Sequence, residues 1–346
     1  MPDKIALNAL ALRPGGSGVQ TYIRELLRAL PEVLTADLVA AVQADAVGEL
    51  PPQVTARVHP VAAGARRALA GLRGLGPSNL VHGLDVDLPL RSSAPTVATV
   101  HDLSVFDVPW AFSRHRAAGE RMLIRRSLRR ADAIIAVSRF TAQRVRDLLG
   151  RDTIPIPLAP SLDMRPPGPG AIEAVRERYA LPQRFVLHVG TIEPRKDVMT
   201  LAEACRQIGV PLVLAGGRTG ATTPATARAL GYVPRPDLAP LYGAATVVAY
   251  PSLYEGFGLP PVEAMACGAV VLASRATSLP EVLGDAAAFA PPRDAEGLAK
   301  ALRDLMGDKE RRSHLARAAV AHAARYSWSA TAEATAGVYR SLGVRC

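Results

Sequence analysis

Two glutamates, Glu255 and Glu263, stand eight positions apart on either side of a glycine-rich loop. A Pro-Pro pair follows the loop, and proline is favourable at the first positions of a helix because its missing N–H would be unpaired there. The pattern predicts a helix over 261–267 that is closed by Gly268. Loop 256–259 would then offer backbone N–H groups at a positive helix end, which suits an anionic or polyhydroxylated ligand. An acidic surface loop before an ordinary helix is the plainer interpretation.

Two adjacent cations form a second candidate group. Arg195 and Lys196 follow a predicted strand, 185–189, and open α/β sheets bind ligands at the carboxyl ends of their strands. A guanidinium can bind two phosphate oxygens at once, and an ammonium supplies a compact point charge. The pair is therefore a candidate phosphate site. The alternative is a surface turn in which the cations pair with Glu193 or Asp197.

Three further motifs are weaker. The loop Gly15-Gly-Ser-Gly18 after the first predicted strand can cradle phosphate, but a dinucleotide fingerprint would need glycine where Thr21 stands. His101 follows the predicted strand 96–100, where it would meet substrate hydroxyls or form a local hydrogen bond. The Asp85-Val-Asp87 motif resembles that of metal-dependent sugar transferases, but it lacks a third oxygen ligand nearby, so we predict no metal site.

Strands and helices alternate along the chain, which predicts an α/β fold of parallel sheets with helices on both faces. Predicted strands are 4–10, 38–42, 80–82, 96–100, 133–137, 185–189, 211–215, 247–250 and 269–273. Predicted helices are 19–30, 112–130, 139–149, 198–208, 238–242 and 327–342, and 218–229 is predicted to be a loop or irregular helix.

A Pro- and Gly-rich stretch, 155–170, interrupts this alternation and predicts a domain linker. We expect an N-terminal Rossmann-like domain over 1–160 and a second one over 161–326. A C-terminal helix over 327–346 is expected to pack back toward the first domain. Two such halves make the cleft between them the natural binding site.

Composition predicts a soluble globular enzyme of the cytoplasm. The chain is 49% hydrophobic and 21% charged, and no apolar run approaches the roughly 18–20 residues of a membrane helix. Its start lacks the charged and apolar regions of a signal peptide. The three cysteines are an odd number without metal-type spacing, as expected in a reducing compartment.

The net charge of +10 comes almost wholly from arginine. The stretch 114–130 holds seven arginines, and Glu120 is its only acidic residue. A basic amphipathic helix can rest on an anionic membrane, which would place the enzyme peripherally at the inner face, or it can be an ordinary solvated face. Nucleic-acid binding is not predicted, because the cations lack interleaved aromatic residues.

Taken in order, these motifs resemble retaining glycosyltransferases of family 4. The residues that carry the resemblance are 15–26, 100–103, 131–138, 189–196, 231–233 and the pair Glu255 and Glu263. The similarity runs nearly end to end and is greatest to mannosyltransferase-like enzymes that build polysaccharides. It implies the GT-B architecture, α/β, in which two facing Rossmann-like domains enclose an inter-domain cleft.

The resemblance also implies roles for individual residues. Arg195 and Lys196 would bind the diphosphate of the donor, Glu255 would contact the sugar, and Glu263 would accept hydrogen bonds from the ribose. Further donor contacts would come from Gly16, Gly190, Thr191, Tyr232, Val233, Gly256, Phe257, Gly258 and Leu259, and His101 would approach the 6-position of the sugar. Many relatives carry arginine at the place of Thr191, so Arg195 would have to supply that phosphate contact.

The implied reaction moves a hexose such as mannose from a nucleoside-diphosphate sugar to a glycan, lipid-linked or small natural-product acceptor. No metal or other cofactor is expected, and configuration would be retained by same-face substitution with Glu255 orienting the donor. Two alternatives stay open, namely a GT-B nucleotide-sugar epimerase or hydrolase and a non-catalytic nucleotide-sugar-binding subunit. Thr21 argues against an NAD-dependent oxidoreductase.

Overall fold

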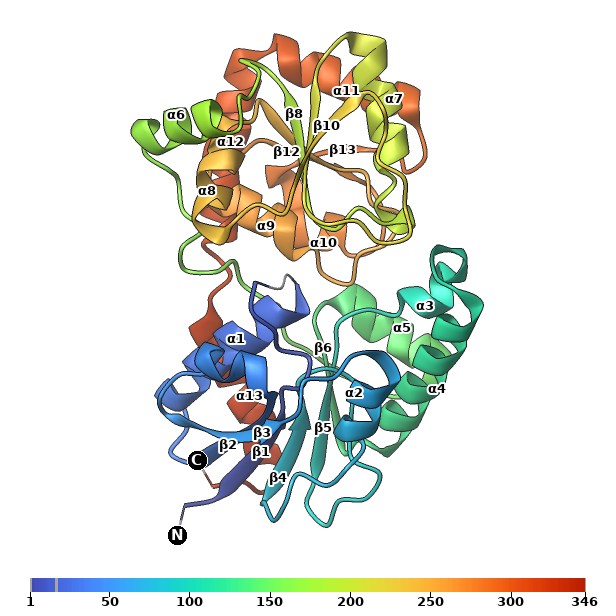
Figure 1. Cartoon of the computed structure of the whole chain (residues 1–346), viewed down its shortest axis with the longest axis vertical. Helices are drawn as coiled ribbons and strands as arrows, with labels where there is room; N and C mark the ends of the chain where they lie inside the picture. The colour runs from blue at the N-terminus through green and yellow to red at the C-terminus, as the bar shows by residue number, and fades with distance from the viewer. Residues whose placement is uncertain (1, 16–17, 346) are drawn as a thin grey trace. The chain divides into compact units, whose positions relative to one another are not determined.

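The computed structural model describes residues 2–15 and 18–345, which divide into two compact units (Figure 1). Unit 1 comprises 1–107, 113–158 and 327–346. Unit 2 comprises 108–112 and 159–326. Each unit holds one parallel sheet flanked by helices, so the predicted α/β class is confirmed.

Unit 1 is built on a seven-stranded sheet in which all neighbours are parallel. In spatial order its strands are β3 (Val54–His59), β2 (Asp37–Gln43), β1 (Lys4–Asn8), β4 (Leu80–Gly83), β5 (Thr96–Val100), β6 (Ala133–Ala136) and β7 (Ile154–Pro155). Its helices are α1 (Val19–Ala29), α2 (Gly64–Gly71), α3 (Ser104–Asp107), α4 (Arg114–Arg130), α5 (Arg139–Leu149) and α13 (Trp328–Ser341), with 3-10 turns at Leu30–Glu32 and Ala44–Glu49.

The last helix, α13 (red in Figure 1), belongs to unit 1 although it follows the whole of unit 2 in sequence. It packs against α1, and the Tyr339 hydroxyl lies 2.6 Å from Nδ1 of His82 on β4. His82 is fully buried, and burial lowers the pKa of its imidazole to about 3. The buried hydrogen bond explains why the end of the chain is held on this sheet.

Unit 2 is built on a six-stranded parallel sheet. In spatial order its strands are β10 (Ala227–Gly231), β9 (Leu212–Ala215), β8 (Val186–Val189), β11 (Val247–Tyr250), β12 (Val271–Ser274) and β13 (Ala288–Ala290). Its helices are α6 (Pro169–Arg178), α7 (Val198–Ile208), α8 (Arg235–Ala244), α9 (Leu259–Ala266), α10 (Leu279–Leu283), α11 (Ala295–Gly307) and α12 (Lys309–Ala323), with 3-10 turns at Pro109–Ala111, Pro194–Lys196 and Gly284–Ala286.

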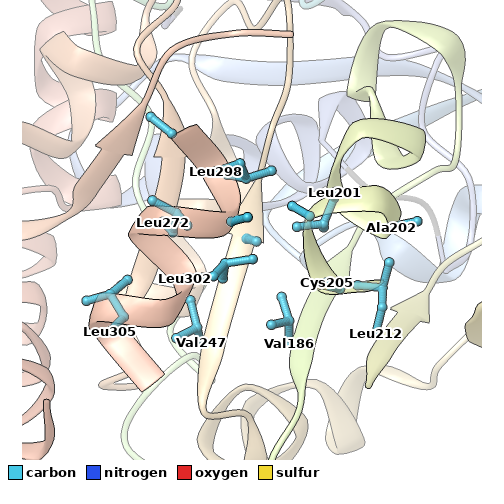
Figure 2. Packing of buried hydrophobic residues seen from close by; sticks show 14 of the residues in the cluster. Val186, Leu201, Ala202, Cys205, Leu212, Val247, Leu272, Leu298, Leu302 and Leu305 are labelled. Carbon is cyan, nitrogen blue, oxygen red and sulfur yellow. The ribbon is translucent and has the colours of Figure 1, made fainter. Parts of the chain in front are cut away.

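The core of unit 2 lies between this sheet and two of its helices (Figure 2). Strand residues such as Val186 and Val247 meet Leu201 of α7 and Leu302 of α11, and all four side chains are fully buried. Buried aliphatic runs of this kind are typical of parallel strands that are covered on both faces. This packing holds β8 rigidly, and β8 carries one half of the site described below.

The sequence predictions miss the helices α2, α3, α6, α10, α11 and α12, and they fail at the edges of the sheets. Residues 218–229 were expected to be a loop or irregular helix, but they run into β10, which pairs only with β9 at the edge of its sheet. Most of β10 is exposed or half-buried, so it lacks the apolar run by which strands are recognised. The edge strands β3, β7 and β13 were missed as well, and α8 is longer than the predicted 238–242.

Candidate active site

The strand order of unit 2 reverses between β8 and β11. Chain connections run outward from this point in both directions, to β9 and β10 on one side and to β12 and β13 on the other. In open α/β sheets such a switch point opens a crevice at the carboxyl ends of the two strands. The loop after β8, residues 190–197, and the loop after β11, residues 251–258, both begin there.

Glycines let the loops after β8 and β9 approach closely. Gly190 has φ 145° and Gly216 has φ 141°, a region that favours glycine. A Cβ on Gly216 would lie 2.1 Å from the carbonyl oxygen of Gly190. The amide of Gly190 donates to Ala215 at 2.9 Å, and that of Ile192 donates to Gly217 at 2.8 Å. The first half of loop 190–197 is therefore fixed by backbone contacts alone.

A short 3-10 turn at Pro194–Lys196 presents the two cations. Glu193 precedes it with an extended backbone, and proline occupies the first position of the turn. The Lys196 amide donates to the Glu193 carbonyl at 2.9 Å. Asp197 ends the turn with φ 49° and leads directly into α7. Because the turn is closed at both ends, Arg195 and Lys196 have defined positions.

Both cations contact one carboxylate of the opposite loop. Nζ of Lys196 lies 2.5 Å from Oε1 of Glu255, and Nη1 of Arg195 lies 3.5 Å from Oε2. Nη1 of Arg195 also donates to the carbonyl of Tyr254 at 2.9 Å, and the amide of Leu253 donates to the carbonyl of Arg195 at 2.8 Å. The structure thus brings together three of the residues predicted from sequence.

Glu255 is a buried anion stabilised by these cations. It is only 6% exposed, and such burial by itself raises the pKa of a carboxyl group. The charges of Lys196 and Arg195 outweigh burial and lower the pKa of Glu255 to about 2. Glu255 is therefore ionised at any physiological pH, and it is an acceptor of hydrogen bonds rather than an acid.

Two hydroxyl residues that sequence reasoning missed bind the backbone of the Glu255 loop. The amide of Glu255 donates to Oγ1 of Thr277 at 3.0 Å. The hydroxyl oxygen of Ser278 lies 2.9 Å from the carbonyl oxygen of Glu255 and 3.0 Å from that of Phe257. Its one hydrogen is donated toward these two acceptors. Both follow β12, and no spacing rule links them to a loop more than twenty residues upstream.

Gly258 turns the chain from this loop into α9. It has φ 96°, and a Cβ there would lie 2.8 Å from Cδ2 of Leu279. The helix begins at Leu259, two residues before the predicted start, and both prolines lie in its first turn. Phe257 is buried, and its ring lies edge-on to that of Tyr326 with 5.7 Å between the ring centroids, so its side chain packs into unit 2. Gly256 precedes it in the loop.

Two comparisons of the sequence now identify the chain. The family profile described as "Glycosyltransferase Family 4" matches residues 16–160, and the one described as "Glycosyl transferases group 1" matches residues 172–322. The chain is 35% identical over 285 residues to the O-antigen chain mannosyltransferase B of Escherichia coli, covering 76% of this chain and 74% of that one. The chain belongs to glycosyltransferase family 4.

Other similarities agree with this family and with its GT-B fold. The serotype-specific mannosyltransferase WbdA of Escherichia coli is 33% identical over 227 residues, which are 59% of this chain and 28% of that longer protein. Sucrose-phosphate synthase from Thermosynechococcus elongatus has the same fold, with a TM-score of 0.79 at 24% identity over 98% of this chain and 99% of that one. The resemblance predicted from the motifs is confirmed, and the protein is a glycosyltransferase.

The remaining predicted donor residues of this glycosyltransferase lie at or near the same sheet edge. Thr191 and Gly190 begin the loop after β8, and Glu263 lies buried on α9. Tyr232 and Val233 directly follow the edge strand β10; Tyr232 is 63% exposed, whereas Val233 is buried. Gly16 falls outside the described residues. Their roles in donor binding stay predictions.

His101 lies in unit 1, just after β5. Its Nε2 lies 2.9 Å from the carbonyl oxygen of Leu84, to which it donates. The imidazole ring also lies edge-on to the ring of Tyr22, with 4.7 Å between the two ring centroids. The partner follows the neighbouring strand β4 and is 17 positions away, so this is not a hydrogen bond within the turn, and contact of His101 with a sugar stays a prediction.

The Asp85-Val-Asp87 motif is part of a buried contact within unit 1. Oδ2 of Asp87 lies 3.3 Å from Nη1 of Arg67, and burial raises the pKa of Asp87 to about 6. Over residues 2–15 and 18–345 we find no cluster of three or more histidine, cysteine or acidic side chains placed to hold a metal ion. The motif therefore has a structural partner that sequence reasoning did not identify.

The arginine-rich helix α4 exposes one apolar side chain among cations. Met122 is 72% exposed, and Arg114, Arg125 and Arg129 recur at helical spacing on its side of the helix. Arg121 instead donates through Nε to the carbonyl of Val105 at 2.7 Å. Among the described residues no helix is both long and apolar enough to span a bilayer.

Proposed function

We propose that this glycosyltransferase moves a hexose, with mannose as the first candidate, from a nucleoside-diphosphate sugar to a glycan, lipid-linked or small-molecule acceptor. The observation that carries the proposal is the convergence of Arg195 and Lys196 on Glu255 at the switch point of unit 2. Mannose is favoured because two relatives that are 35% and 33% identical to this chain are named as mannosyltransferases.

The two cations stabilise the leaving group. Cleavage of the bond between sugar and diphosphate leaves negative charge on the β-phosphate, and preorganised cations lower the free energy of that transition state. Arg195 and Lys196 are already ordered by the Pro194–Lys196 turn and by Glu255, so little reorganisation accompanies the reaction. Thr191 supplies a backbone contact to the same phosphates, and Gly190, which has no side chain, lets them approach the loop.

The rest of the donor extends from this point along the sheet edge. Glu255 and the backbone of 256–259 receive the sugar, Glu263 accepts from the ribose, and Tyr232 with Val233 lies beside the base. This arrangement of the donor is supported by the positions of these residues, all of which follow the carboxyl ends of β10 or β11. Unit 1 has the acceptor-binding role, with His101 contacting the 6-position of the sugar.

Transfer proceeds with retention of configuration and without a metal ion. Each carboxylate oxygen of Glu255 is within 3.5 Å of a cation, an environment that suits an orienting anion better than a covalent nucleophile. The acceptor therefore attacks from the face of the leaving group, and the departing phosphate takes the acceptor's proton. Arg195 and Lys196 supply the positive charge that a metal supplies in other sugar transferases.

A donor panel tests the proposal. The protein is incubated with UDP-, GDP-, dTDP- and ADP-hexoses and a short mannose-terminated acceptor, in buffer containing EDTA, and the product is examined by NMR. We expect transfer from one donor, with the anomeric configuration of the donor preserved. An inverted product, a requirement for added metal or a glycosyl adduct on Glu255 in the mass spectrum would each contradict the mechanism. Donor turnover at the same rate without acceptor would indicate an epimerase or hydrolase.

A further inference from the structure

We propose that Glu193 competes with the donor diphosphate for Arg195 and thereby limits the affinity of the site for the nucleoside diphosphate that leaves. The inference rests on the proposed function, because it takes Arg195 as a diphosphate ligand. It concerns a residue that was considered from sequence only as the partner of a surface turn.

Glu193 binds the outer side of the Arg195 guanidinium. Nη2 of Arg195 lies 2.7 Å from Oε1 of Glu193, which is closer than the 3.5 Å between Nη1 and Glu255. A guanidinium binds phosphate best when both of its terminal nitrogens face the oxygens. One of those nitrogens is held by Glu193, so a diphosphate that uses both must displace that carboxylate.

The four side chains that pair with one another at this point carry no net charge. Arg195 and Lys196 contribute two positive charges, and Glu193 and Glu255 contribute two negative ones. A diphosphate bound to Arg195 brings at least two more negative charges close to the carboxylates of Glu193 and Glu255, and like charges at such short separations repel. Binding therefore requires that one carboxylate move away from the cations.

Glu193 is the carboxylate that can move. The Glu255 side chain is 8% exposed and has Lys196 as a second cationic partner, whereas the Glu193 side chain is 19% exposed and is paired with Arg195. The backbone of Glu193 need not change, because its carbonyl accepts from the Lys196 amide independently of the side chain. Rotation of one side chain into solvent is sufficient to break the ion pair between Glu193 and Nη2 of Arg195.

This competition serves turnover. A site that holds the diphosphate with two unopposed cations would stabilise the product as well as the transition state, and product release would become slow. After the sugar has been transferred, the carboxylate of Glu193 returns to Arg195 and reduces the binding free energy of the product diphosphate. Glu193 thus favours release of the leaving group without touching the sugar.

The test is the affinity for UDP and GDP, measured by isothermal titration calorimetry without divalent metal. For Glu193→Gln we expect tighter binding by roughly threefold to tenfold, where tenfold corresponds to about 1.4 kcal/mol. Steady-state assays should show stronger product inhibition by the same diphosphate. Raising the salt concentration should reduce the difference between the variant and the wild type, because the competition is electrostatic.

Glu203→Gln is the matched control. Glu203 lies on α7 of the same unit, outside both loops, with a side chain that is 42% exposed and a carboxylate that pairs with Arg206 at 2.7 Å. The variant has the same change in net charge and loses an ion pair of the same length. Tightening by Glu203→Gln equal to that by Glu193→Gln would show a general charge effect and overturn the inference.

Weaker binding by Glu193→Gln would show that Glu193 positions Arg195 for phosphate instead of competing for it, and would also overturn the inference. That outcome leaves the proposed function intact, provided that the wild type binds a diphosphate and Lys196→Ala does not. If the wild type binds neither UDP nor GDP, and ADP and dTDP fail as well, the inference and the proposed function are both wrong.

Discussion

Nζ of Lys196 lies 2.5 Å from Oε1 of Glu255, although 59 positions separate the two residues in the chain. The contact is possible because β8 and β11 are neighbours in the sheet, so that the loops leaving them face each other. Each residue depends on the other, since a buried charge is stable only when it is paired.

Replacement of Lys196 tests this dependence. We expect Lys196→Ala to lower kcat/KM by about 10²–10³-fold, as when one charge-stabilising donor is removed from an active site. Glu255 would then be left buried with Arg195 alone, and stability should fall by about 3–5 kcal/mol in urea denaturation. Lys300→Ala, at an exposed position of α11, should change neither quantity.

A double variant separates the two effects. Lys196→Met with Glu255→Gln removes both charges together, so we expect stability to recover toward that of the wild type. Transfer should stay low because the leaving group lacks its cation. Recovered activity in the double variant would contradict the role assigned to Lys196.

The contact between the loops after β8 and β9 predicts a strong effect of one methyl group. A Cβ at Gly216 would lie 2.1 Å from the carbonyl oxygen of Gly190, in a backbone region that disfavours side chains. We expect Gly216→Ala to lower stability by about 2–3 kcal/mol and to weaken diphosphate binding. Gly217→Ala is the control, because a Cβ there meets nothing within 4 Å. Similar melting temperatures for the two variants would refute the assignment.

We expect stability to depend on pH because of His188, which lies on β8 just before loop 190–197. Burial lowers the pKa of His188 from 6.5 to about 4, and its Nδ1 lies 2.9 Å from the carbonyl of Ala249. Because the folded pKa lies below the unfolded one, the unfolded chain binds the proton more readily. The stabilisation from His188 is therefore complete above pH 6.5 and is lost as the pH falls toward 4.

The measurement compares unfolding free energies at pH 7 and pH 5. We expect the decrease between these values to be smaller by about 2 kcal/mol in His188→Gln than in the wild type. His115→Gln, at an exposed position of α4, should leave the decrease unchanged. An equal decrease in wild type and His188→Gln would mean that His188 does not titrate as its burial requires.

The exposed face of α4 predicts binding to anionic membranes. We expect the protein to sediment with phosphatidylglycerol vesicles at low salt and to be released at high salt. Arg114→Gln with Arg129→Gln should weaken this binding by about 2 kcal/mol, roughly thirtyfold, since each cation near such a surface contributes about 1 kcal/mol. The control is Arg311→Gln with Arg317→Gln on α12, which has the same change in charge. Equal binding of neutral and anionic vesicles would rule out this surface.

Much of the fold and of the site could be predicted from the sequence, because the decisive signals are local. Strands such as β5, β8 and β11 are buried apolar runs, and a buried parallel strand requires such a run. Arg195 and Lys196 were recognisable because they stand in the loop that follows β8. The edge strand β10 gave no such signal, since half-buried and exposed residues need not be apolar.

By itself the sequence determined which residue types stand at the carboxyl ends of the strands, because strand, turn and helix signals depend on neighbours in the chain. Only the tertiary structure decided that β8 lies beside β11, and hence that Glu255 pairs with Lys196 and that Thr277 and Ser278 hold its loop. It also decided that Glu193 holds Arg195. Strand order arises from the packing of the whole sheet, and contacts across tens of residues follow from that order alone.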